Sequence, residues 1–405
     1  SGVEQLVVTG RTGGDAFHVA DLTPTEIEHV VLDVTPGDTD SITVNGRAAD
    51  DNVFISTPGA GTVNVLGLEY DVRLLNVTTA DRLTVLGNEG DDAIQANAGV
   101  ENTVLLTLDG GDGNDSLSGA GILIGGPGDD FLEGGAGNDQ LFGNDGQDTL
   151  VGGLGNDMFD GGPGADTILI RGTAANDIID VFQTAPGAVD DSGYVLGWSL
   201  NGVGQPDTIA QDTAGSPGAA GTRPTVEEVR IEAALGNDLI RVGVSDAYSD
   251  LDPSNGAPHQ SLRFNVLGDA PNDSDRLVVQ DDGLGDLVVL HQAPDQRSGR
   301  VSVAPGVTIA GGGTGLADVV YAGIERLDIT PLDPVTSGTG TDGQGRIVVF
   351  HSDPFEFNDS RLNAGQLTRV GQNPTSPSIG PGGITTPFAV NGDEDWYEFR
   401  PTATN

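Results

Sequence analysis

"GGAGNDQLFGNDGQDTLVGGLGNDMFDGGPGADTIL", residues 134–169, repeats one nine-residue pattern four times. Each copy begins with Gly and has Gly again at its fourth place, Asp at its sixth, and an aliphatic residue or Phe at its eighth. Gly at fixed places suits tight turns with positive φ, and one apolar residue per copy suits a short strand with one buried side chain. The pattern therefore predicts a solenoid, in which each coil buries its inner side chains by stacking on its neighbours.

The sixth-place Asp gives each turn a hard anionic oxygen. A cation of calcium size takes six to eight oxygens at about 2.3–2.6 Å, from carboxylates and backbone carbonyls, so two stacked turns are needed for one site. Nine residues make half a coil, which predicts Asp130, Asp148 and Asp166 on one edge and Asp139 and Asp157 on the other. The inward side chains form a thin ladder, so we expect calcium to supply much of the folding free energy. The predicted ladder is Leu117, Leu132, Leu141, Leu150, Phe159 and Ile168.

The pattern G-G-x-G-x-D-x-U-x, in which U is the apolar residue, resembles the RTX or haemolysin-type calcium-binding repeat. Matching copies start at residues 110, 125, 134, 143, 152 and 161. The resemblance implies a parallel β-roll, several bound Ca²⁺ ions and a secreted protein that fills with calcium outside the cell. The metal ligands we expect first are Asp115, Asp130, Asp139, Asp148, Asp157 and Asp166. A second group of candidate ligands is Asp92, Asp112, Asp129, Asn138, Asp145, Asn156, Asp177 and Asp238.

Several copies depart from the pattern. The stretch "GAGILI", residues 119–124, separates the first two copies without an Asp, which leaves the register of Asp115 open. Asn144 replaces the second Gly of one copy, and Ala165 replaces the usual Asn or Asp of another, so we expect weaker sites there. Looser turns keep the sixth-place Asp but lose Gly elsewhere, and for them a role in shaping the turn is favoured over metal binding, with Asp92 the best exception. These turns contain Asp15, Asp51, Asp92, Asp177 and Asp238.

Weaker repeats lie on both sides of the strict block. "SITVNGRAADDNVFIS" at 41–56 aligns without gaps on "RLTVLGNEGDDAIQAN" at 82–97, a period of 41 residues. A second phrase, an aliphatic residue followed by Glu and alternating apolar residues, recurs at 2–8, 27–32, 68–74, 226–231 and 323–329. We therefore predict an all-β fold, a parallel β-roll or β-helix solenoid with calcium-binding turns. Whether the flanks continue one solenoid or form separate sandwiches stays open.

The C-terminal part has a different character. "DPFEFNDSRLNAGQL" at 353–367 and "GDEDWYEF" at 392–399 resemble the start of a bacterial pre-peptidase C-terminal domain, although Phe357 stands where that family usually has Pro. The resemblance implies part of a secreted β-sandwich-like module. The predicted domains are 1–109 and 170–335 as degenerate β-repeats, 110–169 as the calcium β-roll, 336–345 as a linker, and 346–405 as the incomplete module.

Composition excludes several classes of function. The net charge is −44 and all 17 basic residues are Arg, which argues against nucleic acid and anionic membranes as partners. The chain has no Cys, no apolar run long enough to insert in a membrane, and no zinc or nucleophile motif around its five His. We therefore predict no catalytic residues and no enzyme activity in this chain. A carbohydrate-active β-helix is a weaker alternative, because Lys is absent and Arg is scattered.

Two functions fit these observations. The first is a non-enzymatic, calcium-binding structural segment of a large secreted bacterial protein of the cell surface, a fibre or a matrix. Its partners would be calcium and either further copies or neighbouring domains of the same protein. The alternative is a calcium-dependent export and folding module of a secreted hydrolase whose catalytic domain lies outside this chain.

Overall fold

The computed structural model shows an all-β protein built mainly from parallel strands, as the repeats predict, with one short 3₁₀ turn, η1 (Val100–Asn102), among the described residues. The chain forms two compact units, an N-terminal unit (residues 1–170, 187–199 and 203–230) and a C-terminal unit (171–186, 200–202 and 231–405). The structure describes residues 4–23, 25–34, 36–183, 194–209, 211–212, 223–224, 226–244, 263–268, 274–281, 287–292, 297–304, 317–331, 346–351, 379–380, 383–384 and 396–399.

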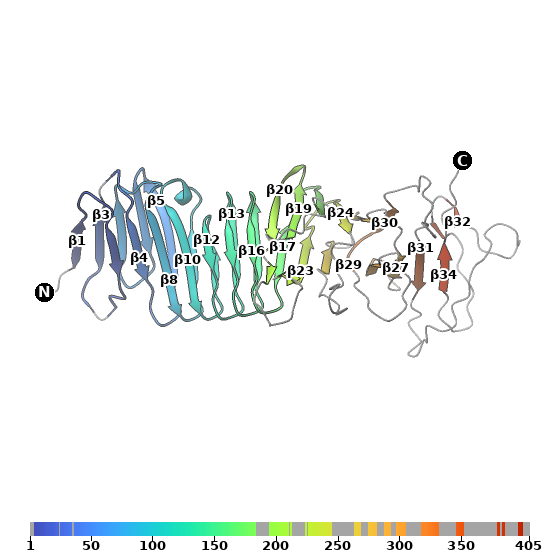
Figure 1. Ribbon diagram of the computed structural model, residues 1–405, viewed down its shortest axis with the longest axis horizontal. Helices are drawn as coiled ribbons and strands as arrows, with labels where there is room; N and C mark the ends of the chain where they lie inside the picture. Colours follow the sequence, from blue (N-terminus) through green and yellow to red (C-terminus); the bar gives the residue numbers. More distant parts are fainter. Residues whose placement is uncertain are drawn as a thin grey trace, which may run out of the picture. The chain divides into compact units, whose positions relative to one another are not determined.

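The N-terminal unit is built mainly from two sheets, and apart from β5–β7 successive strands up to β17 alternate between them (Figure 1). The first sheet has the order β1 (Gln5–Thr9), β3 (His29–Asp33), β7 (Asp71–Leu75), β6 (Thr62–Leu66), β5 (Asn52–Gly59), β9 (Ala93–Ala96), β11 (Ser116–Ser118), β13 (Phe131–Ala136), β15 (Thr149–Leu154) and β17 (Thr167–Arg171). The second has the order β2 (Ala16–Val19), β4 (Ser41–Asn45), β8 (Arg82–Glu89), β10 (Leu105–Asp112), β12 (Ile122–Ile124), β14 (Gln140–Phe142), β16 (Met158–Asp160) and β20 (Val203–Ile209). In the strict block each coil therefore contributes one strand to each sheet.

The core of the strict block is the predicted single-file ladder. Leu132 pairs with Leu150 in the first sheet and Leu141 with Phe159 in the second, each eighteen residues apart, so nine residues do make half a coil. All six predicted inward side chains are at most 2% exposed. Because each strand of the block contributes so little apolar area, packing alone stabilises these coils weakly.

The N-terminal coils continue the same two sheets into the block. The 41-residue period is the coil itself, because Ile42 pairs with Leu83 and Val53 with Ile94. This coil is long because β6 and β7 add to the first sheet, with β6 antiparallel to both of its neighbours. The predicted border at residue 109 falls within β10, which pairs with β8 on one side and β12 on the other.

In the C-terminal unit four parallel strands lie side by side, in the order β18 (Ile178–Gln183), β24 (Leu239–Val244), β26 (Arg276–Asp281) and β30 (Arg326–Pro331). Another series runs β25 (Arg263–Leu267), β29 (Ala317–Ala322), β28 (Gly299–Ala304), β27 (Leu287–Gln292), β31 (Arg346–His351) and β34 (Trp396–Phe399). The other strands among the described residues are β19 (Tyr194–Leu200), β21 (Gln211–Asp212), β22 (Arg223–Pro224), β23 (Glu228–Glu232), β32 (Ile379–Gly380) and β33 (Gly383–Ile384). The predicted linker at 336–345 and most of the predicted module at 346–405 lie outside the described residues.

Candidate metal centre

Aspartates that directly precede the strands of the first sheet form a continuous column. The Oδ1 of each accepts the backbone N–H of the aspartate one coil earlier: Asp115 donates to Asp130 at 2.7 Å and Asp130 to Asp148 at 2.8 Å. We call this series the first column; its members are Asp51, Asp92, Asp115, Asp130, Asp148, Asp166 and, at its end, Glu227. One oxygen of each carboxylate after Asp51 thus ties two coils together.

A second column precedes the strands of the second sheet. Here Asp139 donates its N–H to Asp157 at 2.9 Å, and Asp157 donates to Asp207 at 3.0 Å. An earlier stretch of the same edge contains Asp15, Asp40 and Asp81, linked in the same way. The hydrogen bonds therefore link the aspartates in the two separate series that the sequence predicts. Metal ligation by them stays a prediction.

Asp115 keeps the register of the first column despite the interruption at 119–124. It lies 15 residues before its partner Asp130, whereas Asp130 lies 18 residues before Asp148. The three missing residues come from the intervening turn of the second column, where Gly121 takes the place of an aspartate and donates its N–H to Asp139 at 2.7 Å. The interruption therefore removes one carboxylate from the second column and leaves the first column intact.

The second oxygen, Oδ2, is unpaired in every aspartate of the strict block's two columns and also in Asp40 and Asp92. It is buried and has no hydrogen-bond partner in Asp40, Asp92, Asp115, Asp130, Asp139, Asp148, Asp157 and Asp166. All of these side chains are at most 3% exposed. A buried, unpaired carboxylate oxygen is costly, and so each one calls for an explanation such as a bound ion.

Burial makes these carboxylates hard to ionise without a counter-ion. It raises the pKa of Asp130, Asp148 and Asp166 to about 7, and the charge of neighbouring carboxylates adds to the increase. Burial also raises the pKa of Asp92 and Asp139 to about 6. No Lys or Arg occurs between Arg82 and Arg171, so the block has no side-chain cation of its own.

At Asp15, Asp51 and the aspartates of the strict block, the pairing of Oδ2 follows the residue four places before the aspartate. In the turns of Asp15 and Asp51 that residue is Arg, and its N–H donates to Oδ2 at 2.7 and 2.6 Å. We call such turns closed. In the strict block the same place has a left-handed φ, +124° at Gly126 and +73° at Asn144, and the N–H of Gly126 donates to the carbonyl of Gly143 instead. These turns, which we call open, leave Oδ2 without a donor.

Asn144 therefore keeps the backbone conformation of the Gly that it replaces, as does Asn88 (φ +85°) before Asp92. Asn is the residue other than Gly that adopts this region most readily. The departure at Asn144 leaves the geometry of the Asp148 turn unchanged, and Oδ2 of Asp148 is unpaired like the others.

The unpaired oxygen and a backbone carbonyl of the next coil lie near the same glycine. A Cβ built on Gly143 would lie 2.2 Å from Asp148 Oδ2 and 2.6 Å from the carbonyl oxygen of Gly161. At Gly134 the corresponding oxygens belong to Asp139 and Gly152, at 2.7 and 2.8 Å. A carboxylate oxygen and a carbonyl oxygen close to each other repel, whereas a hard cation between coils is stabilised by both.

The donor set therefore fits Ca²⁺, which prefers carboxylate and carbonyl oxygens. Within the part of the chain that the structure describes, no three acidic or His side chains converge on one point. A calcium ion here would consequently use backbone carbonyls and water beside one or two carboxylates. Such a set suits Ca²⁺ better than a transition metal, which favours nitrogen and sulfur ligands.

The second group of candidate ligands occupies other places of the turns. Fifth-place side chains form an outer ladder, in which Gln147 donates its N–H to Asp129 at 2.9 Å and Asn156 to Asn138 at 3.0 Å. The third-place Asp112 and Asp145 have exposed side chains, and their backbone carbonyls accept N–H groups of Gly90 and Gly128. Whether any of them ligates calcium stays a prediction.

Asp177 and Asp238, in the C-terminal unit, belong to a further column. Asp177 donates its N–H to Asp238 at 2.6 Å, Asp238 donates to Asp275 at 2.9 Å, and Asp275 donates to Glu325 at 2.8 Å. The Asp177 turn is closed, because Thr173 donates its N–H to Oδ2 and Asn201 donates its side-chain amide to Oδ1 at 2.7 Å. Asp177 is therefore a weaker candidate ligand than the aspartates of the block.

Sequence reasoning missed several members of these columns. Asp40 and Asp81 stand two places before a buried Ile42 and Leu83, the Asp-x-apolar spacing of the nonapeptide, but their turns lack its glycines. Glu227 ends the first column by accepting the Asp166 N–H at 2.7 Å. Glu227 and Glu325 both belong to the recurrent phrase of an aliphatic residue followed by Glu. That phrase could have predicted the glutamates at the ends of the columns.

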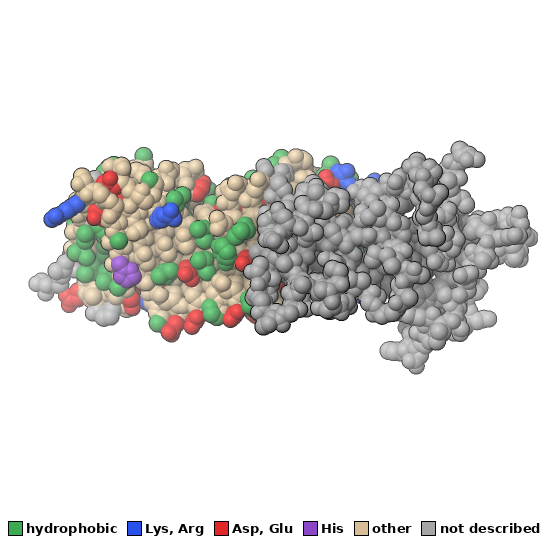
Figure 2. All heavy atoms as spheres, in the orientation of Figure 1, with side chains coloured by type: hydrophobic (Ala, Val, Ile, Leu, Met, Phe, Trp, Pro, Cys, Tyr) green, Lys and Arg blue, Asp and Glu red, His purple; other side chains and the backbone are tan. Residues whose placement is uncertain are grey.

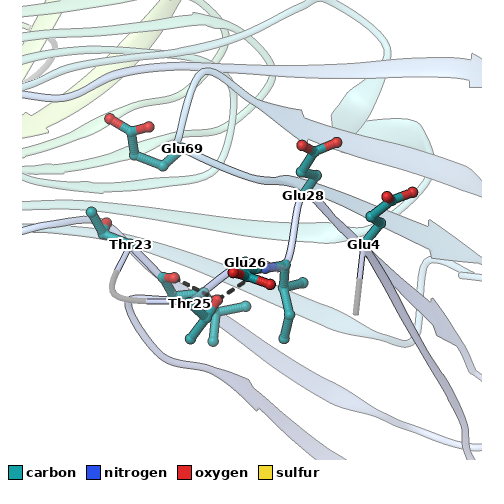
Figure 3. A pocket seen from close by; sticks show the side chains of 8 residues that line it. Glu4, Thr23, Thr25, Glu26, Glu28 and Glu69 are labelled. Carbon is teal, nitrogen blue, oxygen red and sulfur yellow. Dashed lines mark hydrogen bonds between the residues drawn. The ribbon is translucent and has the colours of Figure 1, made fainter. Parts of the chain in front are cut away.

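A separate acidic pocket near the N-terminus lacks these features. Figure 3 shows Glu4, Glu26, Glu28 and Glu69 around it, together with Thr23 and Thr25. All four glutamates are exposed, and Glu69 lies 3.5 Å from Arg47. Exposed carboxylates remain hydrated, so this cluster does not require a cation. On the face drawn in Figure 2, acidic side chains also gather along one edge of the N-terminal unit, with few basic ones beside them.

The fold and the columns define a class: parallel β-solenoids whose turns present carboxylates to a hard cation. The family model of the RTX calcium-binding nonapeptide repeat matches residues 107–121, 118–150 and 136–168. These repeats indicate calcium binding and are typical of secreted proteins. The comparison with curated proteins gives no match. Among the described residues, no helix is both long and apolar enough to cross a membrane.

Proposed function

We propose that this chain is a non-enzymatic structural segment of a large secreted bacterial protein of the cell surface, a fibre or a matrix, and that extracellular calcium folds and stiffens it. The observation that carries the proposal is the row of buried, unpaired Oδ2 atoms in coils without any basic residue. Calcium between coils would neutralise both columns and link each coil to the next. The ligands would be Asp115, Asp130, Asp139, Asp148, Asp157 and Asp166, with Asp92 as an additional one.

A calcium titration of the decalcified chain tests this proposal. We expect far-UV circular dichroism to gain β signal cooperatively with millimolar calcium, because ligands from stacked coils form only together. Single-molecule pulling should show a higher unfolding force with calcium than with a chelator. A β signal and an unfolding force that do not respond to calcium would contradict the proposal.

Association with further copies or with neighbouring domains fits the exposed end of the first sheet. The side chains of β1 are exposed, including Leu6 at 39% and Val8 at 36%, although they stand in register with the buried Val30 and Leu32. A strand added beside β1 would cover this row, as each coil covers the one before it.

An export and folding module of a secreted hydrolase remains the second candidate. It is favoured by the pre-peptidase-like stretches at 353–367 and 392–399, and by the antiparallel pairing of β31 with β34 in that part of the chain. The sequence of the parent protein separates the two. A protease or lipase motif upstream supports the export module, and further aliphatic–Glu repeats support the structural segment.

A further inference from the structure

A buried aspartate outside the nonapeptides has the same unpaired oxygen as the candidate calcium ligands. Asp40 is 0% exposed, and its Oδ2 has no hydrogen-bond partner. Its other polar groups are all used within the second column. Oδ1 accepts the N–H of Asp15 at 2.7 Å, the N–H of Asp40 donates to Asp81 at 2.8 Å, and its carbonyl accepts the N–H of Arg82 at 2.9 Å. One carboxylate oxygen is therefore left over in an otherwise complete network.

A proline occupies the place from which the turns of Asp15 and Asp51 are closed. In the closed turns of Asp15 and Asp51, the N–H four places earlier donates to Oδ2. At Asp40 that place is Pro36, which has no N–H to donate. The neighbouring aspartate Asp81 is closed in a related way, by the N–H of Thr78 at 2.7 Å. Pro36 thus has the same effect on Asp40 as a left-handed Gly or Asn has on the aspartates of the block.

The surroundings of Asp40 supply oxygen rather than nitrogen. Asp15, Asp40 and Asp81 stack in one column, so three carboxylates share this edge. The carbonyl oxygen of Thr39 is turned toward the preceding coil, 2.6 Å from where a Cβ on Gly14 would lie. Pro36 and Thr39 are exposed, which gives water access to the turn. A hard cation can combine such carboxylate, carbonyl and water oxygens, and it would offset the burial of the unpaired charge.

We propose that Asp40 holds a calcium ion at a site of its own, in a coil that carries no nonapeptide. The ligands would be Asp40 Oδ2, carbonyl oxygens of the turn, and water. This site rests on the same calcium chemistry as the proposed function, but it depends on Pro36 rather than on the Gly pattern of residues 110–169. It would place a divalent cation in the part of the N-terminal unit whose other aspartate turns, at Asp15, Asp51 and Asp81, are closed.

The test is the number of calcium ions bound per chain, measured by equilibrium dialysis on the full chain. Pro36→Ala restores the missing N–H without removing the carboxylate, so we expect it to bind one calcium fewer than wild type, as Asp40→Asn does. Pro58→Ala changes an exposed proline of β5 away from any aspartate turn and is expected to bind as wild type does.

Asp148→Asn serves to separate this inference from the proposed function, because it removes a ligand of the block only. If Asp148→Asn loses calcium while Pro36→Ala and Asp40→Asn bind the wild-type number, the site at Asp40 is refuted and the block is not. If wild type binds no calcium, both proposals fail. Should Asp40→Asn not fold, Pro36→Ala alone decides, since it keeps every side chain of the column.

Discussion

Replacing Asp148 by Asn should have opposite effects on stability with and without calcium. Without calcium, burial raises the pKa of Asp148 from its ordinary value of 3.8 to about 7. Each pKa unit corresponds to about 1.4 kcal/mol, so holding this carboxylate ionised in the folded state costs about 4 kcal/mol at neutral pH. Asn cannot ionise, and its side-chain oxygen can still accept the Asp130 N–H. Because Asp130 and Asp166 are coupled to Asp148, we expect a gain of about 2–4 kcal/mol in the metal-free protein.

The pH dependence follows from the sign of the same shift. A raised pKa means that the folded state binds the proton more tightly than the unfolded chain does. The stabilisation that proton binding to Asp148 gives the folded state is therefore fully present below about pH 4 and is lost as the pH rises toward 7. Metal-free wild type should become less stable across this range, whereas Asp148→Asn should lose less. With calcium the order reverses at neutral pH, because the variant lacks a ligand.

The measurement is urea unfolding of decalcified protein, followed by circular dichroism at several pH values and repeated with calcium. Asp51→Asn is the matched control, because Asp51 is in the same column but its turn is closed by the N–H and the guanidinium of Arg47. We expect this control to destabilise the chain by about 1–2 kcal/mol in both conditions. If Asp148→Asn destabilises the metal-free protein as Asp51→Asn does, the assignment of an open, cation-dependent turn is wrong.

Three other predictions test separate parts of the geometry. Asn144→Val disfavours the left-handed conformation, so the N–H of residue 144 should close the Asp148 turn. The number of calcium ions bound per chain should fall, and the stability of the metal-free protein should rise. A variant that binds as much calcium as wild type would show that the left-handed residue does not keep this turn open. Asp139→Asn should remove calcium shared with Asp157 and leave the calcium of the first column bound. The number of calcium ions lost by the double variant Asp139→Asn/Asp148→Asn should then equal the sum of the losses of the two single variants. A different number would argue against independent edges. Gly143→Ala places a Cβ 2.2 Å from Asp148 Oδ2 and should abolish calcium-dependent melting shifts, whereas Gly59→Ala, with no atom within 4 Å, should melt like wild type.

The regular part of the fold could be predicted from sequence because its period is short and its residues are local. Each nonapeptide contains its own turn, its aspartate and its inward side chain, so the eighteen-residue register of Leu132 with Leu150 follows from counting. The buried ladder of inward side chains could be predicted in the same way. The register and the ladder both depend on residues within a single coil, so no pairing between distant segments has to be known.

The parts that could not be predicted depend on pairing between coils of unequal length. Asp115 reaches Asp130 after 15 residues and Asp166 reaches Glu227 after 61, and no fixed period connects such distances. Backbone stacking sets the register there, and it accepts Gly121 or a glutamate in place of aspartate. A motif that records only the aspartate likewise does not predict whether Oδ2 is paired, because that depends on the residues three and four places before it.

That residue explains why the nonapeptide has a second Gly at all. A residue with ordinary φ at this place can close the turn with its own N–H, as Arg47 does at Asp51, and the coil is then complete without metal. The left-handed residue instead gives its N–H to the next coil and leaves a carboxylate oxygen that costs several kcal/mol unless a cation binds. Under the proposed function the strict block is therefore less stable without calcium, while the closed turns at Asp15, Asp51 and Asp81 are satisfied by protein donors. A chain with both kinds of turn can keep a folded edge at low calcium, onto which the block adds coil by coil as the ions bind.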